Sequence, residues 1–212
     1  FYDRQYNSPG TGSVSLTVAG LNFGNIDPTP RQRIDGSACE VTEWVSDSTL
    51  RCKNAGGVGG TKYMTLTIDL QVAWTITEFV SYDIPSLSSG RRVNRAATGS
   101  SSITVHGANF GTNHRTLMLR MGHSATERTT WESDTSVPTL ISHGARGTRR
   151  LVITVGHQDG SVTQSFSLDA PALSKLLWTN RAATGSLQLT VIGLDLGVLS
   201  FTTQMREGHS AC

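Results

Sequence analysis

The amino-acid sequence predicts an all-β protein made of repeated β-sandwiches, and three observations lead to this fold class. First, the heptapeptide Asn-Arg-Ala-Ala-Thr-Gly-Ser at residues 94–100 recurs unchanged at residues 180–186, so the chain contains an internal repeat. Second, 22 glycines and only 16% charged residues are typical of strands and turns rather than helices. Third, short apolar–polar alternations are separated by turn residues, and no long stretch has the period of about 3.6 residues that marks a helix.

The repeat extends in both directions from this heptapeptide. Downstream, Gly-Ala-Asn-Phe-Gly at 107–111 corresponds to Gly-Leu-Asp-Leu-Gly at 193–197, which lies 86 residues later. An earlier and more diverged copy places Gly-Leu-Asn-Phe-Gly at 20–24, which lies 87 residues before 107–111. The spacing falls from 87 to 86 before Asp83, so we expect one extra residue within 71–75, in a loop or a β-bulge.

These correspondences predict the domain organisation. We expect two complete units, 1–84 and 85–170, and a partial third unit, 171–212. Each complete unit is long enough to bury a modest hydrophobic core. Half a sandwich cannot bury its core and leaves open strand edges. We therefore expect the third unit to be completed by later residues or by another subunit.

The second copy gives the clearest view of the strands within a unit. Apolar and polar residues alternate over 100–106, which predicts a half-buried strand, and the glycines of 107–111 then predict a tight turn. A β-branched run at 151–155 predicts a strand, and Asp-Gly within 158–161 predicts a hairpin turn before a returning strand at 162–168. Further short segments are expected at 116–121 and 126–131.

The cysteines indicate the redox compartment. Cys39 and Cys52 correspond to Thr126 and Thr139 at the spacing of 87, so the second copy has lost both cysteines together. Residues replaced as a pair suggest that they act as a pair, and we infer a Cys39–Cys52 disulfide, which implies an oxidising, extracytoplasmic location. The alternative is two separate buried thiols. Cys212 corresponds to Cys39 in the third copy, and we expect its partner to lie outside this chain.

At this point the sequence resembles a known family. Pro85-x-Leu-Ser, a gap and the segment 99–111 resemble the opening of an IPT/TIG domain, and the first copy carries the same pattern at 12–24. Cys39 and the later Cys52 also look like the paired cysteines of that family. The third copy departs from the pattern, because Asp-Leu replaces Asn-Phe there. The resemblance implies tandem immunoglobulin-like (E-set) sandwiches, of the kind found in arrays on cell-surface proteins.

Residues with catalytic or metal-binding chemistry are sparse and scattered. The six histidines show no His-x-x-x-His spacing, and the recurring Gly-His-Ser-Ala has no histidine in the first copy, so exposed loop histidines are the expected interpretation. Asp47 and Asp134 recur after Trp44 and Trp131 and are best explained as turn-capping residues, while the two tryptophans are expected to pack on the sandwich. We therefore predict neither an enzyme nor a cofactor.

Charge and hydropathy limit the partners. A net charge of +2 is too small to favour nucleic acid, and no apolar run of 18 or more residues is present to span a membrane. Thr29, between two prolines, is a candidate for O-glycosylation.

The lead hypothesis is a non-enzymatic, secreted structural protein: a repeat unit of a cell-surface or filament assembly that self-associates, in one version head-to-tail with strand complementation of the third unit. The alternative is an ectodomain that binds a carbohydrate or protein ligand. Candidate inter-unit contacts lie in and beside the recurring heptapeptide. They are Arg95, Ala96, Ala97, Arg181, Ala182, Ala183 and Trp178.

Overall fold

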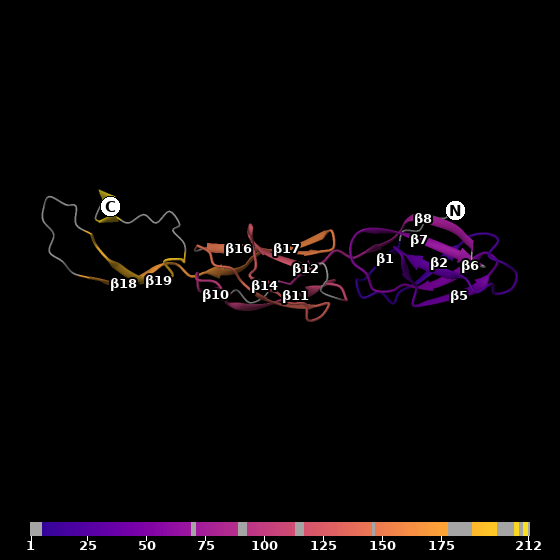
Figure 1. Ribbon diagram of the computed structural model, residues 1–212, viewed down its shortest axis with the longest axis horizontal. Coiled ribbons are helices and arrows are strands. Elements are labelled where there is room, and N and C mark those ends of the chain that lie inside the picture. The colour runs from indigo at the N-terminus through magenta and orange to yellow at the C-terminus, as the bar shows by residue number, and fades with distance from the viewer. Residues whose placement is uncertain are drawn as a thin grey trace.

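A computed structural model describes residues 6–68, 71–88, 93–112, 117–145, 147–177, 188–198, 206–207 and 210–211. Every element in this part of the chain is a β-strand, which confirms the all-β prediction. Strands β1–β8 form an N-terminal sandwich, strands β9–β17 form a central sandwich, and β18–β19 form a C-terminal ribbon. The three bodies lie end to end along the long axis of the molecule (Figure 1).

Each sandwich consists of two facing sheets. The N-terminal sandwich has the sheets β1-β8-β7-β3-β4 and β2-β6-β5. Its strands are β1 (Tyr6–Ser8), β2 (Ser15–Ala19), β3 (Arg31–Ile34), β4 (Ser37–Ala38), β5 (Val41–Ser46), β6 (Thr49–Lys53), β7 (Thr61–Ile68) and β8 (Gln71–Tyr82).

The central sandwich repeats this topology and adds one strand. Its sheets are β10-β17-β16-β12-β13 and β14-β15-β11-β9, and β9 has no counterpart in the described N-terminal sandwich. Its strands are β9 (Ser86–Leu87), β10 (Val93–Arg95), β11 (Ser102–Ala108), β12 (Leu117–Met121), β13 (Ser124–Ala125), β14 (Arg128–Thr129), β15 (Ser136–Leu140), β16 (Gly147–Val155) and β17 (Gln158–Leu168).

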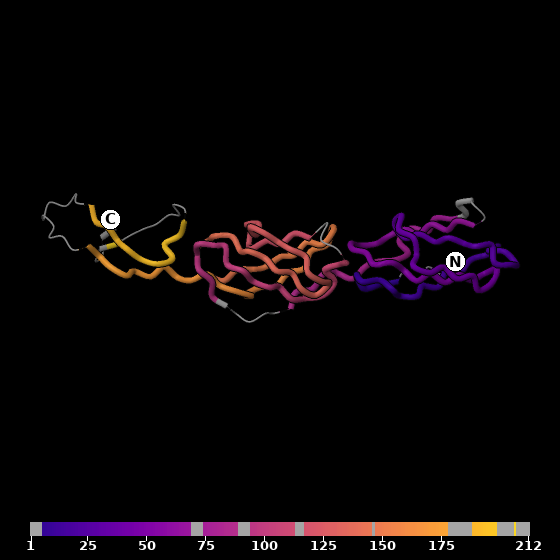
Figure 2. The backbone as a smooth tube through the Cα atoms, turned by 60° about the horizontal axis from the view of Figure 1, so that its bottom comes forward, coloured from indigo at the N-terminus to yellow at the C-terminus, as the bar shows by residue number. Residues whose placement is uncertain are grey.

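Beyond residue 171 the described strands are few. The ribbon pairs β18 (Ala172–Leu176) with β19 (Val191–Leu194), and β20 (Arg206–Glu207) pairs with β21 (Ser210–Ala211). The tube in Figure 2 follows the chain from one sandwich to the next without a return, so the N-terminal sandwich and the ribbon lie at opposite ends.

Side-chain alternation gives each sandwich its own core. In β2, Leu16 and Val18 are buried while their neighbours are exposed, as the period of two requires. The corresponding Val105 in β11 is buried, together with Phe110 after it. The two cores are separate clusters, so each sandwich has the independent core of a small domain.

The extra residue expected within 71–75 is confirmed as a β-bulge. Leu66 pairs with Trp74 but the next residue, Thr67, pairs with Val72, so one residue of β8 has no partner on β7. The equivalent pairs between β16 and β17 keep their register at this point.

The position predicted for the hairpin turn is wrong. Val155 pairs with Gln158, so the turn consists of Gly156 and His157, and Asp159–Gly160 lie within β17. Gly156 has a φ of 63° and supplies the left-handed residue of the turn. Gly160 has a different role, because a Cβ there would lie 2.1 Å from the Pro85 carbonyl oxygen.

Cys39 and Cys52 form a disulfide in the N-terminal sandwich, with their Cα atoms 5.8 Å apart. Cys39 directly follows β4 of one sheet, and Cys52 lies in β6 of the other. The bridge therefore links the two sheets across the core.

The central sandwich uses threonines at the same positions. Thr139 Oγ1 donates a hydrogen bond to the Arg128 carbonyl at 2.6 Å, and the Thr126 and Thr129 hydroxyls lie 2.8 Å apart. A hydrogen-bonded network thus replaces the covalent link between the sheets.

Reduction of the disulfide is expected to destabilise one sandwich selectively. Closing a loop of 13 residues is worth about 3 kcal/mol in the chain-entropy account, and the Cys39→Ser, Cys52→Ser double variant should lose about that much. Two-transition denaturant unfolding of the intact chain measures the loss. The transition of the central sandwich is the internal control, and an equal shift of both transitions would contradict the assignment.

Candidate functional site

Asn7 and Asn94, the equivalent asparagines of the first two copies, anchor strands β1 and β10. β1 pairs in parallel with β8, and β10 pairs in parallel with β17. The Asn7 side chain accepts a hydrogen bond from the Ser81 hydroxyl, and its amide nitrogen donates to Asp83 at 3.1 Å. Asn94 accepts the equivalent bond from Ser167. The asparagine therefore ties the start of a sandwich to the end of its last strand.

The Gly-Ser that ends the heptapeptide forms a left-handed corner. Gly12 and Ser13 have φ values of 73° and 60°, and Gly99 and Ser100 have values of 87° and 53°. A glutamate holds each serine. Ser13 Oγ donates to the Glu40 carboxylate at 3.0 Å, and Ser100 Oγ donates to Glu127 at 2.7 Å.

Glu40 is the acceptor of two donors in this corner. Its carboxylate lies 3.2 Å from Lys53 Nζ and also accepts the Ser13 hydrogen bond. The Lys53 hydrogen bond, and then the one from Ser13, hold the pKa of Glu40 below its usual value. The Glu40 carboxylate, which accepts the Ser13 hydrogen bond, is thus kept ionised.

Between the asparagine and the Gly-Ser corner, each of the first two copies contacts the next unit. In the first copy the Gly10 N–H points to Asn109 Oδ1 of the central sandwich at 3.5 Å. Asn109 also donates through Nδ2 to the Ile84 carbonyl, in the connection between the sandwiches, at 3.3 Å. The Asn109 side chain of the central sandwich therefore contacts both the N-terminal sandwich and the connection between the two.

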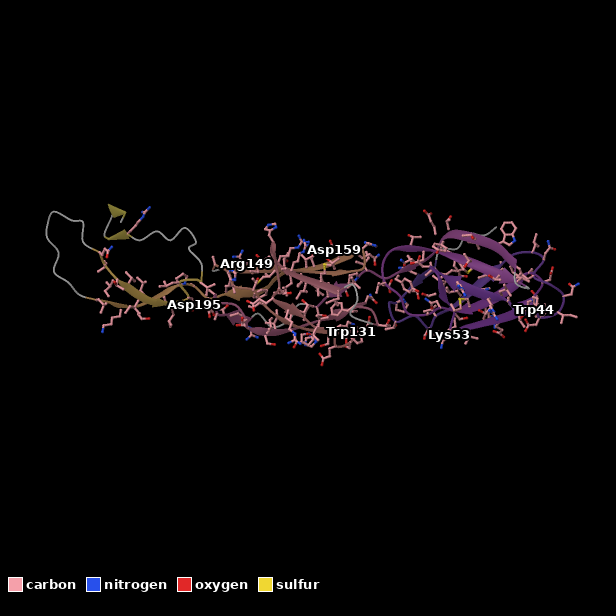
Figure 3. The ribbon with its side chains drawn as sticks, viewed as in Figure 1. Trp44, Lys53, Trp131, Arg149, Asp159 and Asp195 are labelled. Carbon is pink, nitrogen blue, oxygen red and sulfur yellow. A yellow bond between two sulfur atoms is a disulfide. The ribbon has the colours of Figure 1, made fainter. Side chains whose placement is uncertain are left out.

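The same contact recurs at the second junction. Ala97 corresponds to Gly10, and its N–H donates to Asp195 Oδ1 of the C-terminal region at 3.1 Å. Asp195 corresponds to Asn109 and follows β19 (Figure 3). Asn22, Asn109 and Asp195 have φ values of 62°, 64° and 55°, so the loop that carries this acceptor has the same local conformation in all three copies.

Val58 adds an apolar contact at the first junction. It lies in the loop between β6 and β7 and packs against the core of the central sandwich. Gly111 and Gly156 provide the space, because a Cβ at those positions would lie 2.6 Å and 3.3 Å from Val58 methyl carbons. At the corresponding loop position of the central sandwich, the chain has the exposed Ala145.

Two side chains hold Gly111, the glycine against which Val58 packs. Asp134 Oδ1 accepts a hydrogen bond from the Gly111 N–H at 2.9 Å, and Trp131 Nε1 donates to the Gly111 carbonyl at 3.1 Å. Asp47 Oδ1 accepts the equivalent bond from Gly24 at 2.9 Å. Asp47 and Asp134 thus cap the loops that carry Asn22 and Asn109.

A groove of about 310 Å³ with a mixed polar and apolar lining lies beside the first joint. Asp35, Lys62 and Tyr82 line it from the N-terminal sandwich, and His157 lines it from the central sandwich. Lys62 Nζ lies 2.8 Å from Asp35 Oδ2. The Tyr82 hydroxyl donates to the Ala55 carbonyl at 2.9 Å, and burial raises the pKa of this phenol.

Some residues that we predicted as contacts lie at a joint and others do not. Ala97 is buried and donates its N–H across the second junction, and Ala96 is half-buried beside it. The Arg95 side chain lines a crevice within the central sandwich instead. Thr29 is exposed after β2. Arg181, Ala182, Ala183, Trp178 and Cys212 lie outside the described residues.

Sequence reasoning missed Gly10, Val58 and Asn109 as contact residues. The recurrence of Asn109 and Asp195 between two glycines was visible, but the sequence alone explained it as a turn. Val58 has no recurring counterpart that could have drawn attention to it.

No described group of three or more His, Cys, Asp or Glu side chains is arranged to hold a metal ion. The described part of the chain also has no helix of the length and hydropathy that a membrane-spanning helix needs.

Comparison with protein-family models identifies the repeated unit. The IPT/TIG domain model matches twice, over residues 5–81 and 86–168. The chain belongs to the IPT/TIG domain family. The disulfide, the loops of Asn22 and Asn109, and the Gly10–Asn109 contact of the first joint thus lie within these two TIG domains.

The solved structures to which the chain is similar are distant in sequence. A surface glycan-binding protein of Prevotella bryantii is 16% identical with a TM-score of 0.47, over 77% of this chain and 37% of that chain. The plexin A4 extracellular region is 14% identical with a TM-score of 0.40, over 80% and 15%. A Bacteroides ovatus glycan-binding protein solved with a mixed-linkage heptasaccharide is 13% identical with a TM-score of 0.34, over 85% and 47%. The chain thus spans less than half of each protein.

Among curated proteins, no sequence match to this TIG chain is found.

Loss of the Asp134 carboxylate is expected to weaken both the central sandwich and the first joint. Asp134→Ala leaves the buried Gly111 N–H without its acceptor, which should cost about 1–3 kcal/mol of unfolding free energy. Denaturant unfolding measures this loss, and residual dipolar couplings measure the angle between the sandwiches.

Asp47→Ala is the matched control for this variant. It removes the equivalent bond to Gly24, which lies away from the first joint. It should destabilise the N-terminal sandwich and leave the angle between the sandwiches unchanged. An unchanged angle in Asp134→Ala would mean that this loop does not position the joint.

Proposed function

We propose that the chain is a non-enzymatic extracellular structural protein whose tandem TIG domains form a stiff rod, as the repeat unit of a cell-surface stalk or fibre. The observation that carries the proposal is the recurrence of one joint. A backbone N–H of one unit meets an Asn or Asp oxygen of the next, at Asn109 and again at Asp195. We place the units at 1–84, 85–170 and 171–212, with the third unit partial.

The connection between the first two units supports stiffness. Only Asp83, Ile84 and Pro85 separate β8 from β9, and Pro85 is buried. The Asp83 N–H donates to the Ser8 carbonyl at 2.9 Å, and the Ile84 carbonyl accepts from Asn109. A connection whose backbone groups are bonded to both sides has little freedom to bend.

The extracellular location rests on the Cys39–Cys52 disulfide. Such bridges persist where the surroundings are oxidising and are rare in the cytosol. The proposed role is mechanical and needs no catalytic group.

Ligand binding is the second candidate function, and the groove at the first joint favours it. Asp35, Lys62, Tyr82 and His157 supply hydrogen-bonding groups from two units to one concave surface. The hydroxyl groups of a glycan match these hydrogen-bond donors and acceptors. A glycan array tests this role, with Lys62→Ala as the variant expected to lose binding and Lys53→Ala as the control. Wild-type protein that binds no glycan would exclude it.

The rod itself is expected to be stiff in solution. Small-angle X-ray scattering of the intact chain should give one narrow population of extended molecules. Val58→Asp places a charge against the central core and should broaden that population towards shorter maximum dimensions. Ala145→Asp introduces the same charge at the corresponding exposed position and should leave the first joint unchanged. A wild-type profile as broad as that of Val58→Asp would refute the stiff rod.

A further inference from the structure

The central sandwich contains a crevice of about 220 Å³ between its two sheets. Strands β10, β16 and β17 line it from one sheet, and strand β11 lines it from the other. Its described lining residues all belong to the TIG domain at residues 86–168, whereas the groove at the first joint is lined by two units. The crevice is therefore a separate candidate site that lies within one unit.

Arg95 is an arginine on the inner face of a sheet. It pairs with Leu168 in the parallel β10–β17 ladder, and Leu168 is buried in the core, so the paired Arg95 side chain also turns inward. Arg95 is half-buried and lines the crevice. Its Nε is buried and has no hydrogen-bond partner among the described residues. A buried donor on a charged group is costly unless an acceptor, and above all an anion, meets it.

Ser165 brings a second unpaired polar atom to the same crevice. It lines the crevice and is only 8% exposed, and its Oγ is likewise without a partner in the described part of the chain. The register between β16 and β17 shifts after Val162, and Ser165 lies in the bulged segment that follows. Because of this bulge, Ser165 and Phe166 are both buried, although consecutive residues of a regular strand face opposite sides.

The N-terminal sandwich has an aromatic ring at the position of Ser165. Phe79 corresponds to Ser165 at the spacing of 86 and lies in the equivalent bulge of β8. Its ring is 6% exposed and packs against the ring of Tyr6, with the centroids 5.4 Å apart. The bulge thus inserts an apolar ring into the core of one sandwich and an unpaired hydroxyl into the other.

The position of Arg95 differs between the two sandwiches in the same sense. Its counterpart Ser8 is fully buried and accepts a hydrogen bond from Asn54 Nδ2 at 2.7 Å. In the central sandwich, Ile141 stands at the place of Asn54, at the spacing of 87, and has no hydrogen-bonding side chain. Both polar positions of the crevice therefore lack the internal solution that the N-terminal sandwich has, which leaves two donors available to a ligand.

The lining favours a carboxylate that is attached to an apolar body. The planar guanidinium of an arginine matches the two oxygens of a carboxylate, and a serine hydroxyl can donate to the same group. No Asp or Glu belongs to the described lining, so no carboxylate of the crevice itself competes for these donors. The rest of the lining includes the core residues Val105, Leu151 and Phe166. An inorganic anion would leave this apolar surface in contact with water, whereas an organic acid covers it.

We propose that this crevice binds a small organic carboxylate, with Arg95 as its ion-pair partner and Ser165 as a second hydrogen-bond donor. The apolar lining holds the body of the ligand. The site goes beyond the proposed structural function, because it lies within one unit and depends on neither joint. A free organic acid and the chain end of a partner peptide share this chemistry, and two probes distinguish these sources.

Titration of the isotope-labelled 212-residue chain with sodium benzoate at neutral pH, followed by NMR, tests the proposal. The Arg95 Nε–H signal and the backbone amide signals of residues 165–166 should shift saturably, with a Kd of about 1 mM or tighter. Benzamide has nearly the same shape without the charge and should bind at least about tenfold more weakly.

A short peptide that ends in a phenylalanine carboxylate is the second probe. Tighter binding than benzoate assigns the site to the chain end of a partner, and weaker binding assigns it to a free acid. No saturable shift with either probe at about 10 mM, tenfold the expected Kd, overturns the proposal. Benzamide that binds as tightly as benzoate also overturns it.

Variants assign the two donors. Arg95→Gln should weaken benzoate binding at least about tenfold, whereas Arg120→Gln, which removes an equal charge from an exposed position in β12, should leave it unchanged. Ser165→Ala should weaken binding by about tenfold, because it removes only the hydroxyl.

Ser165→Phe introduces the ring that Phe79 provides in the N-terminal sandwich and should abolish binding. The amide spectrum of each variant reports whether the central sandwich is folded, and Ser165→Ala decides the matter if Arg95→Gln does not fold. Benzoate binding that Ser165→Ala and a folded Arg95→Gln leave unchanged overturns the proposal.

Discussion

The joints depend on one constraint, the left-handed loop that follows β2, β11 and β19 in the successive units. An Asn or Asp with positive φ places its side-chain oxygen beyond the end of the sandwich, where the preceding unit supplies an N–H. An aspartate carboxylate from the turn before the neighbouring strand, Asp47 before β6 or Asp134 before β15, holds the loop by accepting a glycine N–H. Without this cap, the acceptor would have no fixed direction, and consecutive units would have no fixed angle.

The two sandwiches link their facing sheets in different ways. Where the N-terminal sandwich links its sheets through Cys39–Cys52, the central one uses hydroxyls of Thr126, Thr129 and Thr139. The central sandwich also contains β9 and receives Val58 from its neighbour. The N-terminal sandwich has a covalent link but lacks a described strand in the β9 position.

Several glycines lie where segments that are distant in sequence approach each other closely. Gly107 and Gly160 allow the β9 backbone to pass between β11 and β17, and Gly111 allows contact with Val58. Trp74, which is 57% exposed, stands at the position where the central sandwich has Gly160.

The sequence by itself determined the repeat, the all-β class, the family and the extra residue within 71–75, because these depend on local pattern and on equal spacing. It placed the hairpin turn at Asp159–Gly160, since Asp-Gly is a strong local signal, whereas the tertiary structure places Gly160 against Pro85 and the turn at Gly156–His157. Ala97 was predicted as a contact, whereas tertiary structure alone decided that Gly10 faces the next unit and that Arg95 turns into a crevice. Contacts between units depend on how two folded bodies meet, and no local pattern in either unit encodes that orientation.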